Sequence, residues 1–440
     1  MTDTELELPK GWVKTKLDDV VIRISNGTSE KQTKEKTKFP VTRIETISDT
    51  EINFNRVRYL KNCSKKILDK YKMEYGDILF SNINSDSHLG KTAIFHLTDI
   101  ELIHGMNLLL IRSNREIILP KLLNFIFNYH RTSGFFYSIA QHAVNQSSIN
   151  QTRLKKTPIL LPPLNEQKRI VSKIEELFSK IDSTKQSLEH TKLQLELYRQ
   201  SLFKSLFNRT TNFVTLEECA KIGSGGTPSR QKPEYYGGDI PWVKTTEVQN
   251  SYIQFTSEKI TALGLKNSSA KIYPKSSVIV AMYGEGKTRG KCAILNINAS
   301  TNQACAVIIC DNKKLLYKFC FYWFQSQYDQ MRLKSSGGNQ PNLNLGIIKK
   351  TKIPLPPLEE QKEIVSQIEQ GFTLIENTSK IIESTLQKLQ TMKMSVLKQA
   401  FEGKLVPQDP NDEPASVILE KIKSTKESQS TKQRGIKNVK

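Results

Sequence analysis

The chain has 440 residues, with 65 lysines and arginines against 44 aspartates and glutamates, so its formal net charge is +21. A field of this sign attracts polyanions, most often nucleic acid, and the length predicts about three domains. No apolar run approaches the roughly 18 residues of a membrane span, and the polar, acidic residues 1–5 do not resemble a secretory leader, so we expect a cytoplasmic protein that spans no membrane.

Two stretches, residues 1–158 and 211–352, have the pattern of mixed α/β (α+β) domains. Short runs of β-branched and aromatic residues lie between turn-forming residues, as at 76–80 and 277–281. The stretches align weakly at shifts of 200 to 201 residues, for example 90–93 with 290–293 and 40–43 with 241–244. We therefore predict one scaffold used twice, with divergent loops, as expected for two readers of different targets.

Basic and amide side chains near glycines and strand ends are the candidates for DNA contact. A lysine or arginine beside a turn glycine can reach a phosphate, and an amide or a tyrosine hydroxyl can reach a base edge. Each candidate could instead have only a structural role, and the loop around 284–291 could be simply solvated. In chain order the candidates are Arg43, Asn82, Asn84, Lys91, Lys244, Tyr283, Lys287, Arg289 and Lys291.

A proline-rich joint follows each of these stretches, and the joint is repeated. Residues 161–171 return as residues 355–365, an offset of 194 that also relates Asn145-Gln146 to Asn339-Gln340. The prolines prevent a helix within the joint, and a long helix is expected to begin at Asn165 and at Glu359. A repeat of this length is no solenoid unit, whose period is roughly 20–50 residues. It indicates a duplicated domain plus helix, hence pseudo-two-fold symmetry and a partner with two similar sites.

Both predicted helices carry apolar residues at alternating steps of four and three, the seam of a coiled coil. Helices that pair antiparallel along this seam, each about 65 Å long, would form a rigid spacer with one domain at either end. The alternative is that each helix packs only on its own domain. The first seam comprises Ile170, Ile174, Leu177, Ile181, Thr184, Leu188, Thr191, Leu195, Tyr198 and Leu202, and the second Ile364, Ile368, Gly371, Ile375, Thr378, Ile382, Thr385, Leu389, Met392 and Val396.

A tail begins near Gly403, where glycine and three following prolines stop the helix. A short amphipathic segment around Val417–Ile422 follows, and from Ser424 the chain is expected to be disordered. The predicted organisation is 1–158 and 211–352 as reading domains, 159–210 and 353–402 as joint plus helix, and 403–440 as tail.

Several motifs in order resemble the specificity subunit of type I restriction–modification systems over nearly the whole chain. They are residues 8–12 (LPKGW), 225–230 (GGTPSR), 237–244 (GGDIPWVK), the twin LPPL joints and 401–407 (FEGKLVP). The first domain departs from the second, having SNGTSE at 25–30 in place of GGTPSR. The resemblance implies two target-recognition domains that each read one half of a bipartite site in double-stranded DNA, separated by two antiparallel helices. It also implies two methyltransferase subunits that carry S-adenosylmethionine, and restriction–translocase subunits that use ATP and Mg.

No catalytic motif is found in the chain, so we expect no enzyme activity and no cofactor of its own. The two Pro-Pro pairs lack the Asn/Asp-Pro-Pro-aromatic pattern of amino-methyltransferases, and the Gly-Lys-Thr runs at 90–92 and 286–288 lack the first glycine of a phosphate loop. Six cysteines without C-x-x-C spacing, and six histidines confined to the first half, predict buried free thiols and no metal site. The alternatives are a fused methyltransferase or nuclease, and a coiled-coil scaffold that does not bind nucleic acid.

Overall fold

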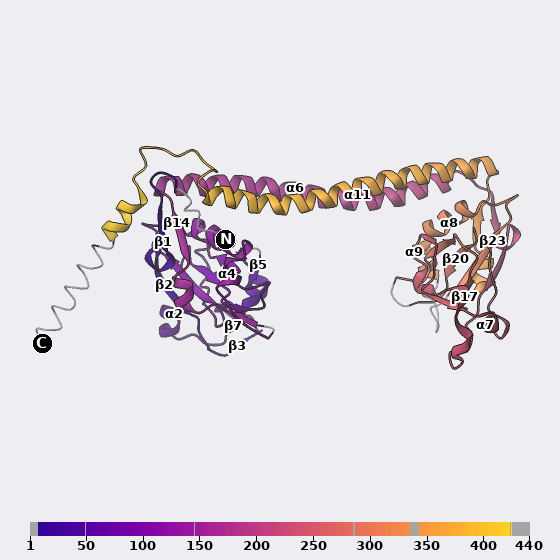
Figure 1. The fold of residues 1–440 in the computed structure, drawn as a ribbon, viewed down its shortest axis with the longest axis horizontal. Coiled ribbons are helices and arrows are strands. Elements are labelled where there is room, and N and C mark those ends of the chain that lie inside the picture. Colours follow the sequence, from indigo (N-terminus) through magenta and orange to yellow (C-terminus); the bar gives the residue numbers. More distant parts are fainter. Residues whose placement is uncertain are drawn as a thin grey trace, which may run out of the picture. The chain divides into compact units, whose positions relative to one another are not determined.

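The computed structural model describes residues 8–48, 50–144, 146–284, 287–334, 343–422 and 424. They fall into two compact units, unit 1 with residues 1–186 and 385–440 and unit 2 with residues 187–384. Each unit holds one mixed α/β head and part of both 44-residue helices, α6 (Leu164–Phe207) and α11 (Leu358–Phe401) (Figure 1). Both helices begin one residue before the predicted positions. No helix among the described residues is long and apolar enough to cross a membrane.

The head of unit 1 is built on a four-stranded antiparallel sheet of order β10-β8-β11-β2. Its strands are β10 (Thr92–Ile94), β8 (Ile78–Phe80), β11 (Leu109–Ser113) and β2 (Val21–Asn26). Helix α3 (Pro120–Thr132) buries its apolar side against this sheet, where Phe80 meets Phe127 and Phe136 edge to face. Such aromatic pairs stabilise a core beyond the area they bury.

The head of unit 2 repeats this arrangement with one more strand, in the order β16-β23-β20-β21-β18. Its strands are β16 (Ala220–Ser224), β23 (Cys305–Cys310), β20 (Val278–Ala281), β21 (Cys292–Leu295) and β18 (Tyr252–Ile253), and α8 (Tyr317–Ser326) takes the place of α3. The prediction of one α/β scaffold used twice is therefore confirmed.

The start and end of each head pair with one another. In unit 1, β1 (Val13–Lys16) lies antiparallel to β14 (Pro158–Leu161), and in unit 2, β15 (Phe213–Thr215) lies antiparallel to β24 (Lys352–Pro354). The remaining elements of unit 1 are α1 (Leu17–Val20), β3 (Gln32–Thr33), β4 (Pro40–Val41), η1 (Ile44–Thr46), β5 (Ile47–Ser48), β6 (Glu51–Ile52), η2 (Phe54–Arg56), β7 (Arg58–Leu60), α2 (Lys65–Tyr71), β9 (Ile83–Asn84), α4 (Phe135–Ser138), β12 (Gln141–Ala143), β13 (Gln146–Ser148) and α5 (Gln151–Lys155). Those of unit 2 are η3 (Leu216–Glu218), η4 (Pro233–Tyr235), β17 (Tyr236–Val243), η5 (Thr245–Glu247), β19 (Glu258–Ile260), α7 (Ala262–Lys266), β22 (Ser300–Thr301), α9 (Tyr328–Lys334) and α10 (Leu345–Lys349).

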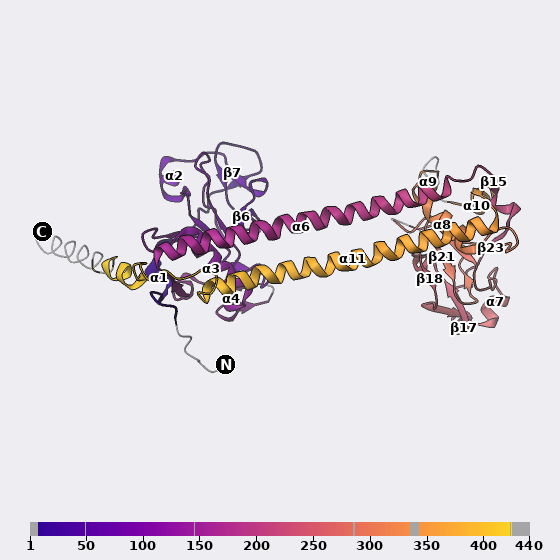
Figure 2. The same cartoon turned by 90° about the horizontal axis from the view of Figure 1, so that it is seen from above.

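The two long helices pair antiparallel within each unit (Figure 2). In unit 1 the Lys393 ammonium lies 2.6 Å from the Asp182 carboxylate and 5.0 Å from the centre of the Phe178 ring. In unit 2 the Arg199 guanidinium lies 4.4 Å from the centre of the Phe372 ring. Because Phe178 and Phe372, like Arg199 and Lys393, are 194 residues apart, the repeat builds the same cation–π contact in both units.

The predicted seam runs through two environments. Ile170 and Ile174 lie in the core of the unit 1 head, and Ile364 and Ile368 lie in that of unit 2. The middle positions are buried or partly buried outside the head cores: Leu177, Ile181, Leu188, Leu195, Ile375, Ile382 and Leu389. The first turns of each helix therefore pack on the head that precedes them in the chain. The last turns pack on the other head, where Leu202 lies against the unit 2 core and Val396 against the unit 1 core. The middle stretches face the other helix, so each of the two alternatives holds in part.

The seam prediction is wrong at Thr184, which is exposed, and at Tyr198 and Met392, which are 47% and 51% exposed. A straight helix has 3.6 residues per turn, so a 3.5-residue repeat drifts around its surface. By the last turns the inward position has moved on by one residue, to Arg199 and Lys393, the cations of the two ring contacts.

A buried histidine in the unit 1 head makes stability depend on pH. His104 is fully buried, its Nε2 lies 3.1 Å from the Leu108 carbonyl, and its Nδ1 has no partner among the described residues. Burial lowers the pKa of this ring from 6.5 to about 4. Between these values the unfolded chain binds the proton and the folded chain does not, so stability falls as pH falls through this window, and the loss is complete below about pH 4.

We expect His104 to contribute about 3 kcal/mol to this loss, since one pKa unit corresponds to about 1.4 kcal/mol. Hydrogen exchange of the β11 amides under increasing urea measures the free energy of unfolding of this head. The difference in this free energy between pH 7 and pH 4.5 should be smaller in His104→Gln, which retains an N–H donor for Leu108 but does not titrate. The His96→Gln variant, at an exposed ring of the same head, is the control. An equal pH difference in His104→Gln and the unaltered chain would refute this role.

Candidate nucleic-acid interface

A bend at residues 81–91, closed by a glycine, follows strand β8 of unit 1 and carries three of the predicted DNA contacts. Gly90, with φ +72°, donates its N–H to the Ser81 carbonyl at 2.8 Å, and Lys91 leaves the bend directly afterwards. Asn82 is only 9% exposed, and its amide lies 3.5 Å from the Ile149 carbonyl. Asn84 donates to the Ser81 hydroxyl at 3.1 Å. Both amides hold the bend in this conformation, and Lys91 is partly exposed.

The same bend occurs in unit 2. Gly290, with φ +86°, donates to the Ala281 carbonyl at 2.9 Å, and Lys291 follows it as Lys91 follows Gly90. Because the backbone bonds match residue for residue, the repeat places one lysine at the same point of each head. The Lys291 ammonium donates to the side-chain oxygen of Gln249.

Other predicted contacts of unit 2 surround this bend, which rests on α9. The Lys287 carbonyl accepts the Tyr328 hydroxyl at 2.7 Å, and the Arg289 carbonyl accepts an Arg332 N–H at 3.4 Å. The side chain of Lys287 is exposed, that of Arg289 is partly buried, and Tyr283 is 37% exposed. Gly286 lies outside the described residues.

The paired positions Arg43 and Lys244 differ in their surroundings. Arg43 lies 3.3 Å from Glu45, with both side chains 42% exposed. The Lys244 side chain is 29% exposed, and its ammonium lies 2.7 Å from Glu258, which Arg230 also contacts at 2.7 Å. Arg230, and after it Lys244, lower the pKa of Glu258 by hydrogen bonding. Both cations therefore contact a carboxylate, and Arg43 is the more exposed of the two.

Arg230 is not among the residues predicted from the sequence, although it ends the GGTPSR motif. Its guanidinium lies over the rings of Tyr236 and Trp242, at 4.3 and 5.2 Å from their centres, and its side chain is 54% exposed. The GGTPSR motif could have drawn attention to Arg230. Its contact with the two rings depends on the fold of β17, however, and cannot be predicted from the spacing of these residues in the sequence.

A cleft of about 1180 Å³ lies between the unit 1 head and the helix pair of the same unit. Lys91 and Arg131 line its head side, and Lys185 lines its helix side. The lining also contains two ion pairs, Lys121 with Glu175 at 2.5 Å and Lys393 with Asp182 at 2.6 Å. The cleft thus has the predicted contact Lys91 in its lining on the head side and cations of the helix pair on the other side.

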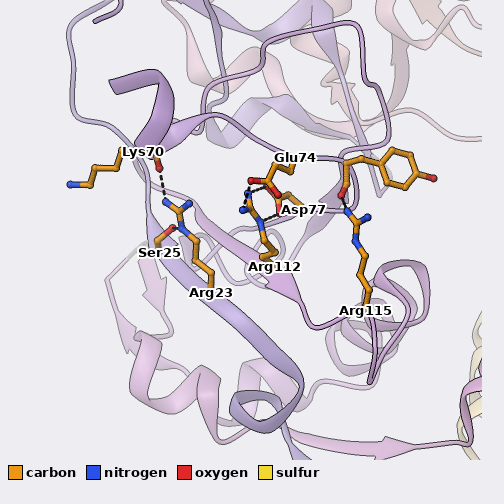
Figure 3. A network of polar contacts seen from close by, with 8 residues as sticks. Arg23, Ser25, Lys70, Glu74, Asp77, Arg112 and Arg115 are labelled. Atoms are coloured by element: carbon orange, nitrogen blue, oxygen red, sulfur yellow. Dashed lines mark hydrogen bonds and ion pairs between the residues drawn. The ribbon is translucent and has the colours of Figure 1, made fainter. Parts of the chain in front are cut away.

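Some arginines of this basic chain bond within the protein and are not available to nucleic acid, as a cluster in the unit 1 head shows (Figure 3). Arg112 on β11 makes a two-pronged contact with Asp77, at 2.7 and 2.8 Å, and reaches Glu74 at 2.5 Å. Asp77 is fully buried, and its carboxylate raises the pKa of Arg112. On the neighbouring strand Arg23 donates to the Lys70 carbonyl at 2.6 Å. These arginines hold the head together.

A buried glutamine joins each head to its long helix. Gln167 is 1% exposed, donates to the carbonyls of Ile117 and Pro162 at 2.9 and 3.0 Å, and accepts the Leu119 N–H at 2.9 Å. Gln361 is fully buried and makes the same three bonds in unit 2, to Lys314, Pro356 and Leu316, at 2.8 to 2.9 Å. The repeated Glu-Gln of the joints is visible in the sequence, but its role as a clamp is not.

Comparison with known protein families finds one family model, which matches the chain at two places. The model of the type I restriction modification DNA specificity domain matches residues 9–192 and 208–387. The chain is 29% identical to a putative type I restriction enzyme MjaX specificity subunit of Methanocaldococcus jannaschii, over 91% of this chain and 95% of the relative. It is 23% identical to the type I restriction enzyme EcoKI specificity subunit of Escherichia coli, over 95% and 96%.

Solved structures share the fold. A structure described as "Structural basis underlying complex assembly and conformational transition of the type I R-M system" aligns with a TM-score of 0.70 and 19% identity, over 90% of this chain and 99% of that one. The HsdS subunit from Thermoanaerobacter tengcongensis aligns with a TM-score of 0.63 and 19% identity, over 92% and 100%.

Proposed function

This chain belongs to the type I restriction modification DNA specificity family, with two DNA-recognition domains, and from that premise we propose that each domain reads one half of a bipartite DNA site. One observation carries the proposal: the glycine bends that present Lys91 and Lys291 are built by identical backbone bonds in two heads of one scaffold. The residues around the bends differ, as two different half-sites require. The long helices, whose middle stretches pair with each other, would set the unspecific spacer between the halves.

We further propose that the chain carries no catalytic activity and serves methyltransferase and restriction–translocase subunits in the cytoplasm. Those subunits would bring S-adenosylmethionine, ATP and Mg. The six free cysteines suit a reducing compartment. A helix surface that binds two methyltransferase copies must occur twice, and Lys168 and Lys362 are exposed at equivalent positions. A second charged group on α6 does not recur in this way. Glu176 forms ion pairs with both Lys173 and Lys180, whereas the equivalent residues of α11 are Gln367, Gln370 and Leu374.

DNA contact by unit 2 is tested at its glycine bend. Replacing Lys287, Arg289 and Lys291 together by Ala should weaken duplex binding and flatten its salt dependence, by about 0.9 in log–log slope for each phosphate that the variant no longer neutralises. Binding of the co-expressed complex is measured by fluorescence anisotropy between roughly 50 and 200 mM salt, the range in which neutralised phosphates affect affinity most clearly.

The matched control removes three exposed lysines elsewhere in unit 2, Lys259, Lys266 and Lys271. It changes the net charge equally, so a general field effect would lower affinity in both variants. An unchanged salt slope in the bend variant would show that Lys287, Arg289 and Lys291 do not contact DNA. An equal change of slope in both variants would show that the bend residues act only through the net charge.

A further inference from the structure

A short β-hairpin lies beside the glycine bend of unit 1 and has two unlike faces. Its strands β12 and β13 pair antiparallel, with Gln141 opposite Ser148, His142 opposite Ser147 and Ala143 opposite Gln146. Strand β13 also pairs with β9 of the bend. Side chains alternate between the faces of a strand, so His142 and Ser147 share one face and Gln141, Ala143 and Gln146 share the other.

The first face ties the hairpin to the bend. Ser147 is 2% exposed and donates its hydroxyl to the Asp86 carboxylate. The His142 ring lies 2.8 Å from this hydroxyl at Nδ1 and 3.1 Å from the Tyr137 carbonyl at Nε2, and it packs against the Tyr137 ring. Three segments of the head therefore meet at one polar network, which fixes the hairpin relative to the bend.

The second face is open and uncharged. Gln141, Ala143 and Gln146 are all exposed, and Val144 beside the tip is 91% exposed. Among the residues that the structure describes, the side-chain amides of Gln141 and Gln146 have no hydrogen-bond partner. In the free protein these two amides bond to water, and the exposed Val144 side chain adds little burial to the fold, so these side chains are open to a binding partner.

We propose that the β12–β13 hairpin inserts into the DNA major groove, with Gln141 and Gln146 as base readers and Asp86, His142 and Ser147 as positioning residues. The assignment deepens the proposed function and rests on it. The major groove admits a two-stranded ribbon, a glutamine amide can bond adenine at N6 and N7, and an apolar side chain can contact the thymine methyl. Since the open face is uncharged, it suits base edges and leaves phosphates to cations such as Lys91.

The test is made on the complex co-expressed with its methyltransferase. Methylated sites are mapped in genomic DNA from cells that carry Gln141→Ala, Gln146→Ala or, as the control, Gln408→Ala, an exposed glutamine of the same unit outside the head. Each hairpin variant should relax one or two base positions in one half-site and leave the other half unchanged. Affinity for the original site should fall about 5- to 150-fold, the discrimination that one two-pronged amide–adenine pair provides, while Gln408→Ala leaves both unchanged.

Positioning is tested at Asp86. Asp86→Ala should lower affinity without altering which bases are preferred, and Asp86→Asn, which keeps an oxygen acceptor for Ser147, should restore part of it. A loss of thermal stability without a change in DNA affinity would assign the network to folding alone and overturn the positioning role.

Three outcomes would overturn the reader assignment. Retention of both half-sites and of affinity removes the hairpin from the DNA, and an equal loss on all sequences makes it a backbone contact. Loss of the methyltransferase from the complex, with the site unchanged, makes it a protein interface. If the unaltered chain directs no bipartite methylation, the proposed function itself fails, which separates the two failures.

Discussion

Replacing Arg112 by Met is expected to lower the free energy of unfolding of unit 1 by about 3–5 kcal/mol, because it leaves a buried carboxylate without its cation. Asp77 is fully buried, and Arg112, with 17% of its side chain exposed, contacts both carboxylate oxygens at 2.7 and 2.8 Å. The other acceptor of this guanidinium, Glu74, has 62% of its side chain exposed and can be solvated by water. The cost therefore falls almost entirely on Asp77.

Hydrogen exchange in β8 and β11 under increasing urea measures this loss locally. Arg23→Met in the neighbouring strand is the matched control, and it should cost much less because Arg23 contacts a hydroxyl and a carbonyl and no buried charge. Adding Asp77→Asn to Arg112→Met should recover part of the loss. A change of less than about 1 kcal/mol in Arg112→Met, the scale of an exposed ion pair, would contradict this account.

Lengthening the helix pair is expected to lengthen the spacer of the DNA site. Four residues inserted after residue 188 in α6 and after residue 386 in α11 lengthen both helices equally, between the pair Asp182–Lys393 of unit 1 and the pair Lys192–Glu383 of unit 2. The insertion adds about 6 Å and a turn of roughly 40°, which corresponds to about two base pairs of B-DNA.

Methylation mapping should then show both half-sites unchanged and a longer gap between them. Substitution of four exposed residues by Ala at the same places, without insertion, is the control and should leave the gap unchanged. A longer helix pair with an unchanged gap would show that the helices do not measure the spacer.

Local sequence patterns predict much of this fold. Apolar runs between turns indicate β8 and β20, the prolines and polar residues of the joints place the starts of α6 and α11 to within one residue, and the 194-residue repeat indicates the shared scaffold. Each of these features depends on residues that are close in the chain, or on a copy that can be aligned.

Features set by tertiary contacts cannot be predicted in this way. Arg112 and Asp77 are 35 residues apart, and Asp86 and His142 are 56 residues apart, with no spacing that links them. Asn82 looks equivalent to Asn84 in the sequence, yet the first is nearly buried and the second is only partly so. The seam prediction fails at Tyr198 and Met392, where a 3.5-residue repeat drifts on a straight helix, and also at Thr184, which is exposed.

The central claim is that two separable domains each read one half of a bipartite site. It is tested most directly by exchanging residues 211–352 for the matching part of a relative with a different site and mapping methylated sites in cells that carry the methyltransferase. The account predicts that one half of the methylated site changes to that of the donor while the other half and the gap stay the same. A change in both halves, or in neither, would contradict it.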